Sequence, residues 1–368
     1  MADDDLTIVV GNQQISGWTS IRVSRGIERV PSDFQIEMTE FYPGDSSNVT
    51  VQPGQQCQVF LGSDLVLTGY VDKYNPRIDP EGHTISISGR SKCEDLVDCS
   101  AEYPNSQIGN TTALDLVSKL AAPYGITVSL LSGTNKNIPQ FSLMFGETAV
   151  EVIERICRSS QLLFYDMPDG NLVLAQIGTA TAASGFEQGV NVQSASANFT
   201  MDQRYSDYQV VRQALFVLAD QGDGSNLQYD DTSDKYVGRN RKKIIVSEAG
   251  DYGLNVTKQR AEWEAKRRFG KSFSVTITTD SWRDSAGKLW TPNTIANVKL
   301  PALKIKNADW VIGEVTYQRD GSSGTTAQLT LYPPTAFSIE PILLQVVNQF
   351  ELGLPESLQV SGVAGSGQ

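Results

Sequence analysis

The chain has 368 residues and a mass of 40.1 kDa, with 40% hydrophobic residues, 20% charged residues and a formal net charge of -12. This size predicts two or three globular domains. The acidic balance argues against tight wrapping of DNA or binding to an anionic membrane, and no apolar run approaches the roughly 20 residues that span a bilayer. The acidic start MADDD is unlike the basic region of a secretory signal, so no export is predicted.

Residues 1–92 are predicted to form an antiparallel β-barrel. The apolar side chains of Phe34, Ile36 and Met38 alternate with polar ones, which is the period of a strand with one buried face. Residues 49–89 continue with a proline turn, short apolar strands and a polar glycine-containing loop before another alternating strand. These features are typical of a small barrel with one face in water.

Residues 93–180 predict a small α/β domain. The threonine pair 111–112 can cap a short helix that ends at Pro123. The stretch GETAVEVIERICRSS predicts a second helix, and the following segment predicts a hairpin turned at Asp169-Gly170. On its polar side the second helix is expected to carry the i,i+4 pairs Glu151–Arg155 and Glu154–Arg158.

Residues 181–270 are predicted to connect this domain to a second barrel. The stretch 179–198 is rich in small polar residues, which is typical of a linker. A strand is expected from Tyr208 to Leu218, and residues 220–243 then form a long polar loop. The charged stretch KQRAEWEAKRRFG predicts a helix anchored by Trp263.

A second barrel, residues 271–337, is predicted because this region repeats the pattern of turns and strands of the first. Residues 290–332 again open with a proline turn and end in an alternating strand, and Gly313-Glu314-Val315 stands where the first barrel has Gly69-Tyr70-Val71. The predicted fold class is therefore α+β, mainly β, with two similar antiparallel β-barrel domains flanking a small α/β domain. Residues 338–368 are predicted to be a flexible C-terminal tail.

No residue pattern predicts a catalytic, cofactor or metal site, so neither a cofactor nor an enzymatic activity is expected. The single histidine, His83, lies in a predicted loop, and neither a G-x-S-x-G elbow nor a P-loop is present. The acidic residues of 220–231 miss the calcium-loop pattern. The four cysteines match no zinc or redox motif, and Cys57 and Cys157 are expected to be buried free thiols.

The second barrel region carries a specific resemblance. The order of RAEWEAKRR, FSVTITT, GKLWTPN and LTLYPPTAF is similar to that in the hub protein of Mu-like phage baseplates, a contractile-tail family related to the upper part of type VI secretion spike proteins. The stretch ETAVEVIERICRSSQLLFYDMPDGNLVLAQ resembles the helix-then-hairpin unit of the same family, and the likeness covers most of residues 1–337. This chain departs from the family pattern at Asp280-Ser281-Trp282, where a glycine-tryptophan pair is expected.

The resemblance implies a structural homotrimer in which two like barrels per chain alternate around a ring. Such a ring adapts the sixfold tail tube and its baseplate to a threefold spike, and it encloses a passage for DNA without binding DNA specifically. The implied location is the virion tail, with assembly in the host cytoplasm and no membrane insertion. The spike would dock at the C-terminal side, where the apolar candidates are Leu343, Leu344, Val346, Val347 and Phe350. Alternatively, these side chains pack on their own barrel.

Two other functions remain open from the sequence. The first is a tail-associated cell-wall hydrolase, whose catalytic carboxylates would meet only in three dimensions. The second is a carbohydrate-binding adhesin, which needs aromatic side chains exposed on one face. Its candidates are Trp18, Trp282, Trp290 and Trp310.

Overall fold

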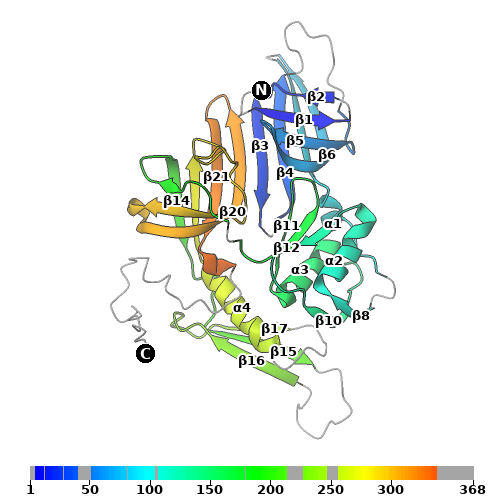
Figure 1. Ribbon diagram of the computed structural model, residues 1–368, viewed down its shortest axis with the longest axis vertical. Coiled ribbons are helices and arrows are strands. Elements are labelled where there is room, and N and C mark those ends of the chain that lie inside the picture. The colour runs from blue at the N-terminus through cyan, green and yellow to red at the C-terminus, as the bar shows by residue number, and fades with distance from the viewer. Residues whose placement is uncertain are drawn as a thin grey trace.

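The described part of the chain is mainly β, as predicted, with 51% of its residues in strands and 17% in helices. Figure 1 shows an elongated molecule in which two β modules stand side by side at one end, above a helical domain and a separate helix with its own small sheet. The computed structural model describes residues 5–11, 13–27, 29–39, 51–80, 82–103, 107–178, 180–213, 227–246 and 256–337. None of the helices in these ranges is long and apolar enough to cross a membrane.

Among the described residues, the first module contains seven strands. Alternation explains their packing, because Phe34, Ile36 and Met38 are buried while Gln35 and Glu37 between them face away from the core. The strands are β1 (Leu6–Val10), β2 (Gln13–Ile15), β3 (Ser20–Gly26), β4 (Arg29–Thr39), β5 (Gln56–Leu61), β6 (Asp64–Asp79) and β7 (Gly82–Ser91).

The middle domain follows at α1, and its second helix begins at the predicted threonine cap. Thr112 accepts a hydrogen bond from Asp115 N–H, and Thr148 forms a capping box with Glu151. The predicted pair Glu154–Arg158 is present, and Arg155 contacts Glu147. The elements are α1 (Glu94–Asp98), β8 (Gln107–Thr112), α2 (Ala113–Ala121), the 3-10 turn η2 (Ala122–Tyr124), β9 (Val128–Leu130), β10 (Asn137–Ser142), α3 (Ala149–Ser160), β11 (Leu163–Asp166) and β12 (Leu172–Ala175).

The prediction that residues 179–198 form a linker is wrong, because this stretch contains two strands of the second module. They are β13 (Phe186–Glu187) and β14 (Val192–Phe199). The alternation along β14 is between serine and alanine, and this contrast is too weak to stand out in the sequence. The polar loop 220–243 is also corrected, since it contains β16 and the start of β17. The inserted elements are β15 (Asp207–Gln213), β16 (Leu227–Ser233), β17 (Lys242–Val246) and α4 (Val256–Lys271).

The second module is completed after α4, whose Trp263 is buried as predicted. Its remaining strands are β18 (Phe273–Thr279), β19 (Ile295–Leu300), β20 (Ile305–Asp320) and β21 (Gly324–Tyr332), with the 3-10 turns η3 (Pro301–Leu303) and η4 (Pro334–Ala336).

The two modules share one strand order. The first runs β3-β4-β7-β6-β5-β1 and the second β14-β18-β21-β20-β19-β13, and corresponding strands also occur in the same order along the chain. The predicted repeat of one β module is therefore present in the structure. One pairing differs, since β1 is antiparallel to β5 whereas β13 is parallel to β19.

Pairing also fixes which residues correspond. Val59 of β5 lies opposite Leu67, and its counterpart Val298 of β19 lies opposite Ala308. With these pairs matched, a bulge follows Val71 in β6 and Ile312 in β20, at the same point of both modules. The two Gly-x-Val steps that look alike in the sequence are therefore three residues out of register.

The prediction of two separate barrels is not confirmed. Among the described residues no sheet closes, and both modules belong to one 13-stranded sheet joined by pairing of β3 with β20. The reason is strand length. β6 and β20 each have 16 residues, whereas β5 and β19 have only 6, so half of each long strand extends past its neighbour and is open to another partner.

Three apolar cores formed by described residues hold these parts together. One continuous core fills both modules, and a second fills the middle domain. A smaller third core lies where the domains meet, and it contains Ile27, Tyr165, Val311 and Phe337. None of the four cysteines, all of which lie in the described ranges, forms a disulfide, and Cys57 and Cys157 are buried as expected.

Candidate assembly interface

The joint between the two modules is a strand pair made by residues almost 300 positions apart. β3 and β20 run antiparallel from Gly26 opposite Glu314 to Ser20 opposite Asp320. Halfway along, the hydroxyl groups of Ser24 and Thr316 lie 3.0 Å apart and share a hydrogen bond. Because backbone pairing fixes register as well as affinity, this seam determines how one module stands beside the other.

A chain of ion pairs crosses the seam on its polar face. Arg29 of β4 contacts Glu314 of β20, and it also lies 2.5 Å from the Asp33 carboxylate. Arg22 of β3 contacts the other oxygen of Asp33 at 2.6 Å. These side chains are roughly one-quarter to two-fifths exposed, so each pair contributes about 0.2–1 kcal/mol.

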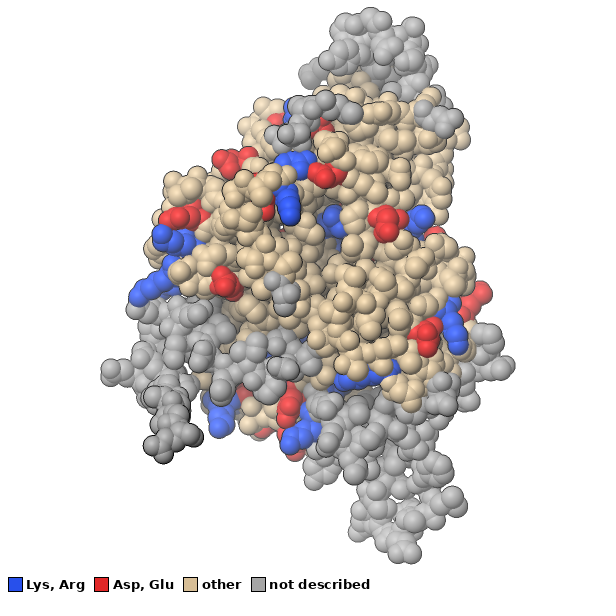
Figure 2. All heavy atoms as spheres, in the orientation of Figure 1, with Lys and Arg blue, Asp and Glu red and all other residues tan. Residues whose placement is uncertain are grey.

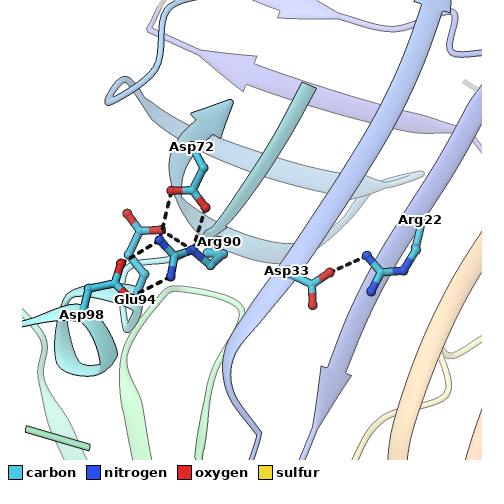
Figure 3. A network of polar contacts seen from close by, with 6 residues as sticks. All are labelled: Arg22, Asp33, Asp72, Arg90, Glu94 and Asp98. Carbon is cyan, nitrogen blue, oxygen red and sulfur yellow. Dashed lines mark hydrogen bonds and ion pairs between the residues drawn. The ribbon is translucent and has the colours of Figure 1, made fainter. Parts of the chain in front are cut away.

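A second polar cluster attaches the first module to the middle domain. Figure 3 shows three carboxylates gathered around the guanidinium group of Arg90 on β7. Its Nε lies 2.6 Å from Asp72 on β6, its Nη2 lies 2.8 Å from Asp98, and Glu94 on α1 is 3.3 Å away. One side chain therefore connects two strands of the module to the first helix of the next domain.

Glu94 is the unusual member of this cluster. Its burial, and then the negative charge of Asp72, raise the pKa of Glu94 to about 8, although Arg90 acts in the opposite direction. The Glu94 oxygen that lies 3.3 Å from Arg90 Nε is buried and has no hydrogen-bond partner of good geometry, in keeping with the raised pKa. Hydrogen bonding to Arg90 lowers the pKa of Asp98.

The same cluster bears on the hydrolase alternative. Glycoside hydrolysis needs two carboxyl groups about 5–9.5 Å apart on either side of an open cleft. Glu94 is only 8% exposed, and both it and Asp72 contact the same guanidinium group. The geometry thus favours a structural connection over a substrate site.

Asn293 attaches the second module to the middle domain. Its backbone is left-handed, with φ of 64°, and its Oδ1 accepts a hydrogen bond of 2.7 Å from Gly178 N–H. Its Nδ2 donates to the Tyr165 hydroxyl and to the Gln176 carbonyl, each at 3.2 Å. One buried amide therefore connects the turn before β19 with the strand hairpin of the middle domain.

The two modules and the middle domain each match a known family. Residues 5–91 match "Mu phage baseplate assembly protein GpP-like, N-terminal", residues 93–176 match "Baseplate hub protein gp44-like, second domain", and residues 254–340 match "Mu phage baseplate assembly protein GpP, fourth domain". The crystal structure of the prophage MuSo2 43 kDa tail protein from Shewanella oneidensis has 30% sequence identity and a TM-score of 0.77, covering 92% of this chain and 100% of that one.

This chain belongs to the baseplate hub family of Mu-like phage tails.

Further relatives agree with this assignment. The hub is 27% identical over 344 residues to baseplate hub protein gp44 of Escherichia phage Mu, which covers 91% of this chain and 89% of that protein. Its fold also resembles the E. coli c3393 protein, a type VI secretion component, with a TM-score of 0.58 at 11% identity over 89% of this chain and 76% of that one. The hub is thus a component of a phage tail, as its sequence predicts.

The positions of the four tryptophans in the hub argue against the adhesin alternative. Trp282, Trp290 and Trp310 are each at most 2% exposed and fill the core of the second module. At Asp280-Ser281-Trp282, where the chain departs from the family pattern, the Trp282 Nε1 donates to the carbonyls of Gln318 and Thr326. Trp18 is partly buried and donates to Leu6. These four rings do not form the exposed platform that sugar binding needs.

The site residues predicted from the sequence differ from those that the structure brings together. The spike-docking candidates all lie outside the described residues, so their role stays a prediction. They are Leu343, Leu344, Val346, Val347 and Phe350. The connections at Ser24, Arg90 and Asn293 were missed because no local sequence pattern indicates them. Ser24 and Asn293 join residues 292 and 115 positions away. The partners of Arg90 are nearer in the sequence, but they meet its side chain only when β6, β7 and α1 are packed together. Asn293 carried one visible signal, its place in the specific turn GKLWTPN.

Proposed function

We propose that the hub assembles as a homotrimeric ring that adapts the sixfold tail tube to the threefold spike. The observation that carries this proposal is the shared strand order of the two modules. Three chains with two such modules each would present six similar units at intervals of about 60°. A tube subunit would then meet nearly the same backbone outline at every position.

The joint within one chain supports this geometry. The modules are held by backbone pairing of β3 with β20, by a shared core and by ion pairs at Arg29, so their relative orientation is fixed before assembly. A rigid pair of modules is what a ring needs, since a hinge at the joint would let the spacing between units vary.

We further propose that the polar face of the long sheet lines a passage for DNA. On this face the second module presents mainly neutral hydroxyl and amide side chains, which offer phosphates few of the cationic contacts that dominate affinity for DNA. They include Ser194 and Ser196 of β14, Thr276 and Thr278 of β18, and Gln328 and Thr330 of β21. Figure 2 shows positive and negative side chains interspersed on the face in view.

The decisive experiment is the mass of the purified hub in solution. Three copies have a mass of 3 × 40.1 = 120.3 kDa, and sedimentation equilibrium over a wide range of concentrations distinguishes this species from a monomer. Particles averaged by electron microscopy should then show threefold symmetry with six peripheral densities. A monomer at every concentration, in the presence and absence of tail tube protein, would overturn the ring.

The C-terminal segment provides the proposed contact with the spike. Leu343, Leu344, Val346, Val347 and Phe350 give residues 338–368 the apolar side chains that a segment ordered on assembly would use. Deletion of residues 338–368 is expected to abolish co-purification with the spike while leaving the trimer intact. Full spike binding by the truncated hub would exclude this contact.

A further inference from the structure

Two equivalent strand halves in the modules have different surroundings. In β20, residues 314–320 lie between β21 and β3 and pair with both. The equivalent half of β6, residues 73–79, pairs with β7 on one side. Among the described residues, no strand pairs with its other side.

Exposure follows this difference. Tyr317 of β20 is fully buried, whereas Pro76, which holds the corresponding position in β6, is exposed. Ile78 nearby is 79% exposed, which is unusual for a large aliphatic side chain in a strand. The free edge of β6 thus leaves apolar surface uncovered where β20 has a neighbour.

The missing neighbour has an equivalent at the opposite end of the sheet. β14 holds the same place in the second module that β3 holds in the first, and among the described strands only β18 pairs with it. Its eight residues, VQSASANF, include neither charge nor proline, although exposed edge strands are usually guarded by such residues. Phe199 at its end is 37% exposed. An unguarded edge of this length is suited to pairing.

We propose that β14 of one chain pairs antiparallel with the second half of β6 in a second copy of this chain, repeating between chains the β3–β20 seam. The proposal rests on the trimeric ring proposed above and names the surfaces that join its subunits. The established seam fixes the register. By equivalence, Tyr74 lies opposite Phe199, Asn75 opposite Asn198, Arg77 opposite Ser196 and Ile78 opposite Ala195.

The side chains in this register are compatible. Tyr74 and Phe199 both lie on the core side of the sheet, where Phe199 already packs against Phe273 with ring centroids 5.8 Å apart. Asn75 and Asn198 would face each other on the polar side, as Thr316 and Ser24 do within the chain. Pro76 cannot donate a backbone hydrogen bond, so the seam between chains has one donor fewer than the seam within a chain.

The same pairing would remove both free edges at once. Each chain contributes the eight-strand run β14-β18-β21-β20-β3-β4-β7-β6. Three copies joined end to end contain 3 × 8 = 24 strands, and the last β6 meets the first β14. A closed sheet has no edges left for further pairing, so assembly would stop at three chains.

The test is disulfide cross-linking of the full-length trimer. The double variant Asn75→Cys/Asn198→Cys places thiols on directly opposed residues, whose Cβ atoms are about 4.5–5.5 Å apart in a strand pair. After mild oxidation, a denaturing gel without reductant is expected to show covalent dimers and trimers. Each single variant should remain monomeric on the same gel, which also controls for the native cysteine Cys99, the only one of the four that is not buried.

Two matched variants calibrate this measurement. Asn75→Cys/Ser194→Cys is four residues out of register and should cross-link at most weakly. Ser24→Cys/Thr316→Cys tests the known seam, where the two hydroxyls are 3.0 Å apart, and should form a bond within the chain. If the control at Ser24 oxidises and the Asn75/Asn198 pair does not, although the protein is a trimer, the proposed seam is wrong and the ring itself stands. A hub that never trimerises overturns both proposals.

A charge pair provides a second measurement should the cysteine variant fail to fold. Like charges on opposed residues destabilise a strand pair, whereas opposite charges support it. Asn75→Asp/Asn198→Asp is expected to raise the concentration at which the trimer dissociates about tenfold, and Asn75→Lys/Asn198→Asp should restore it. Identical dissociation of both variants would contradict the seam.

Discussion

The two modules of the hub have the same strand order but are stabilised by different residues. The core of the first is built from aliphatic side chains around Phe34, whereas the second contains three buried tryptophans. The first is attached to the middle domain by the ion pairs of Arg90, and the second by the hydrogen bonds of Asn293. Backbone outline is therefore kept in the repeat, while packing and attachment have diverged.

The largest expected effect comes from breaking the core of the second module. Trp282→Ala removes a fully buried indole and leaves the carbonyls of Gln318 and Thr326 without their donor, so we expect a loss of about 3–5 kcal/mol in the free energy of unfolding. Phe34→Ala is the matched change in the first module. Because one core and one sheet are shared, urea denaturation should show a single transition in both variants. Two separate transitions would show that the modules fold independently.

The attachment of the second module is tested at Asn293. Asn293→Ala loses the bond from Gly178 N–H and keeps a side chain at a left-handed position, so we expect a destabilisation of about 1–3 kcal/mol. Asn293→Gly relieves the backbone but not the lost bonds, and it should be the milder change. Thermal unfolding measures both, and equal stability of Asn293→Ala and wild type would contradict this role.

The attachment of the first module is tested by pH. The pKa of Glu94 in the folded chain, about 8, lies above its ordinary value of 4.5, so the folded state binds this proton more tightly than the unfolded state. The resulting stabilisation is complete below pH 4.5 and is lost as pH rises through about 8. Glu94→Gln should flatten this part of the stability curve, by roughly 1–2 kcal/mol after screening. Parallel curves for the two proteins would refute the shift.

The smallest effect is expected at the joint itself. Glu314→Gln breaks the contact with Arg29, whose side chain is about one-third exposed, so we expect a loss of about 0.2–1 kcal/mol that shrinks further at high ionic strength. Chemical denaturation at low and high salt measures it. A larger, salt-independent loss would mean that the ion pair, and not the backbone pairing of β3 with β20, holds the modules together.

Local patterns account for what the sequence predicted correctly. The helix cap at Thr112 and the alternation at Ile36 are signals contained within a few residues, and signals of this kind placed most of the elements. The repeat was visible because corresponding strands keep their apolar period. The resemblance carried by RAEWEAKRR and GKLWTPN gave the family, which periodicity alone does not supply.

The errors have three physical causes. β14 was taken for a linker because serine and alanine differ little in hydrophobicity, and the apparent Gly-x-Val match ignored a bulge that only pairing reveals. The β3–β20 seam joins residues from opposite ends of the chain, so no window of sequence contains it. The barrels were wrongly expected to be closed for the same reason, because the sequence indicates how long a strand is but not which strand pairs with it.

The connection from β3 to β4 in the first module differs in length from the equivalent connection, β14 to β18, in the second, and this difference has a consequence for the ring. Only two residues separate β3 from β4, whereas residues 200–272 separate β14 from β18 and contain β15, β16, β17 and α4. In a ring of three chains this arm would occur at every second position, 120° apart. It would distinguish alternate positions of a ring that is otherwise close to sixfold symmetric. A threefold partner that binds on that side would then have three equivalent orientations and not six.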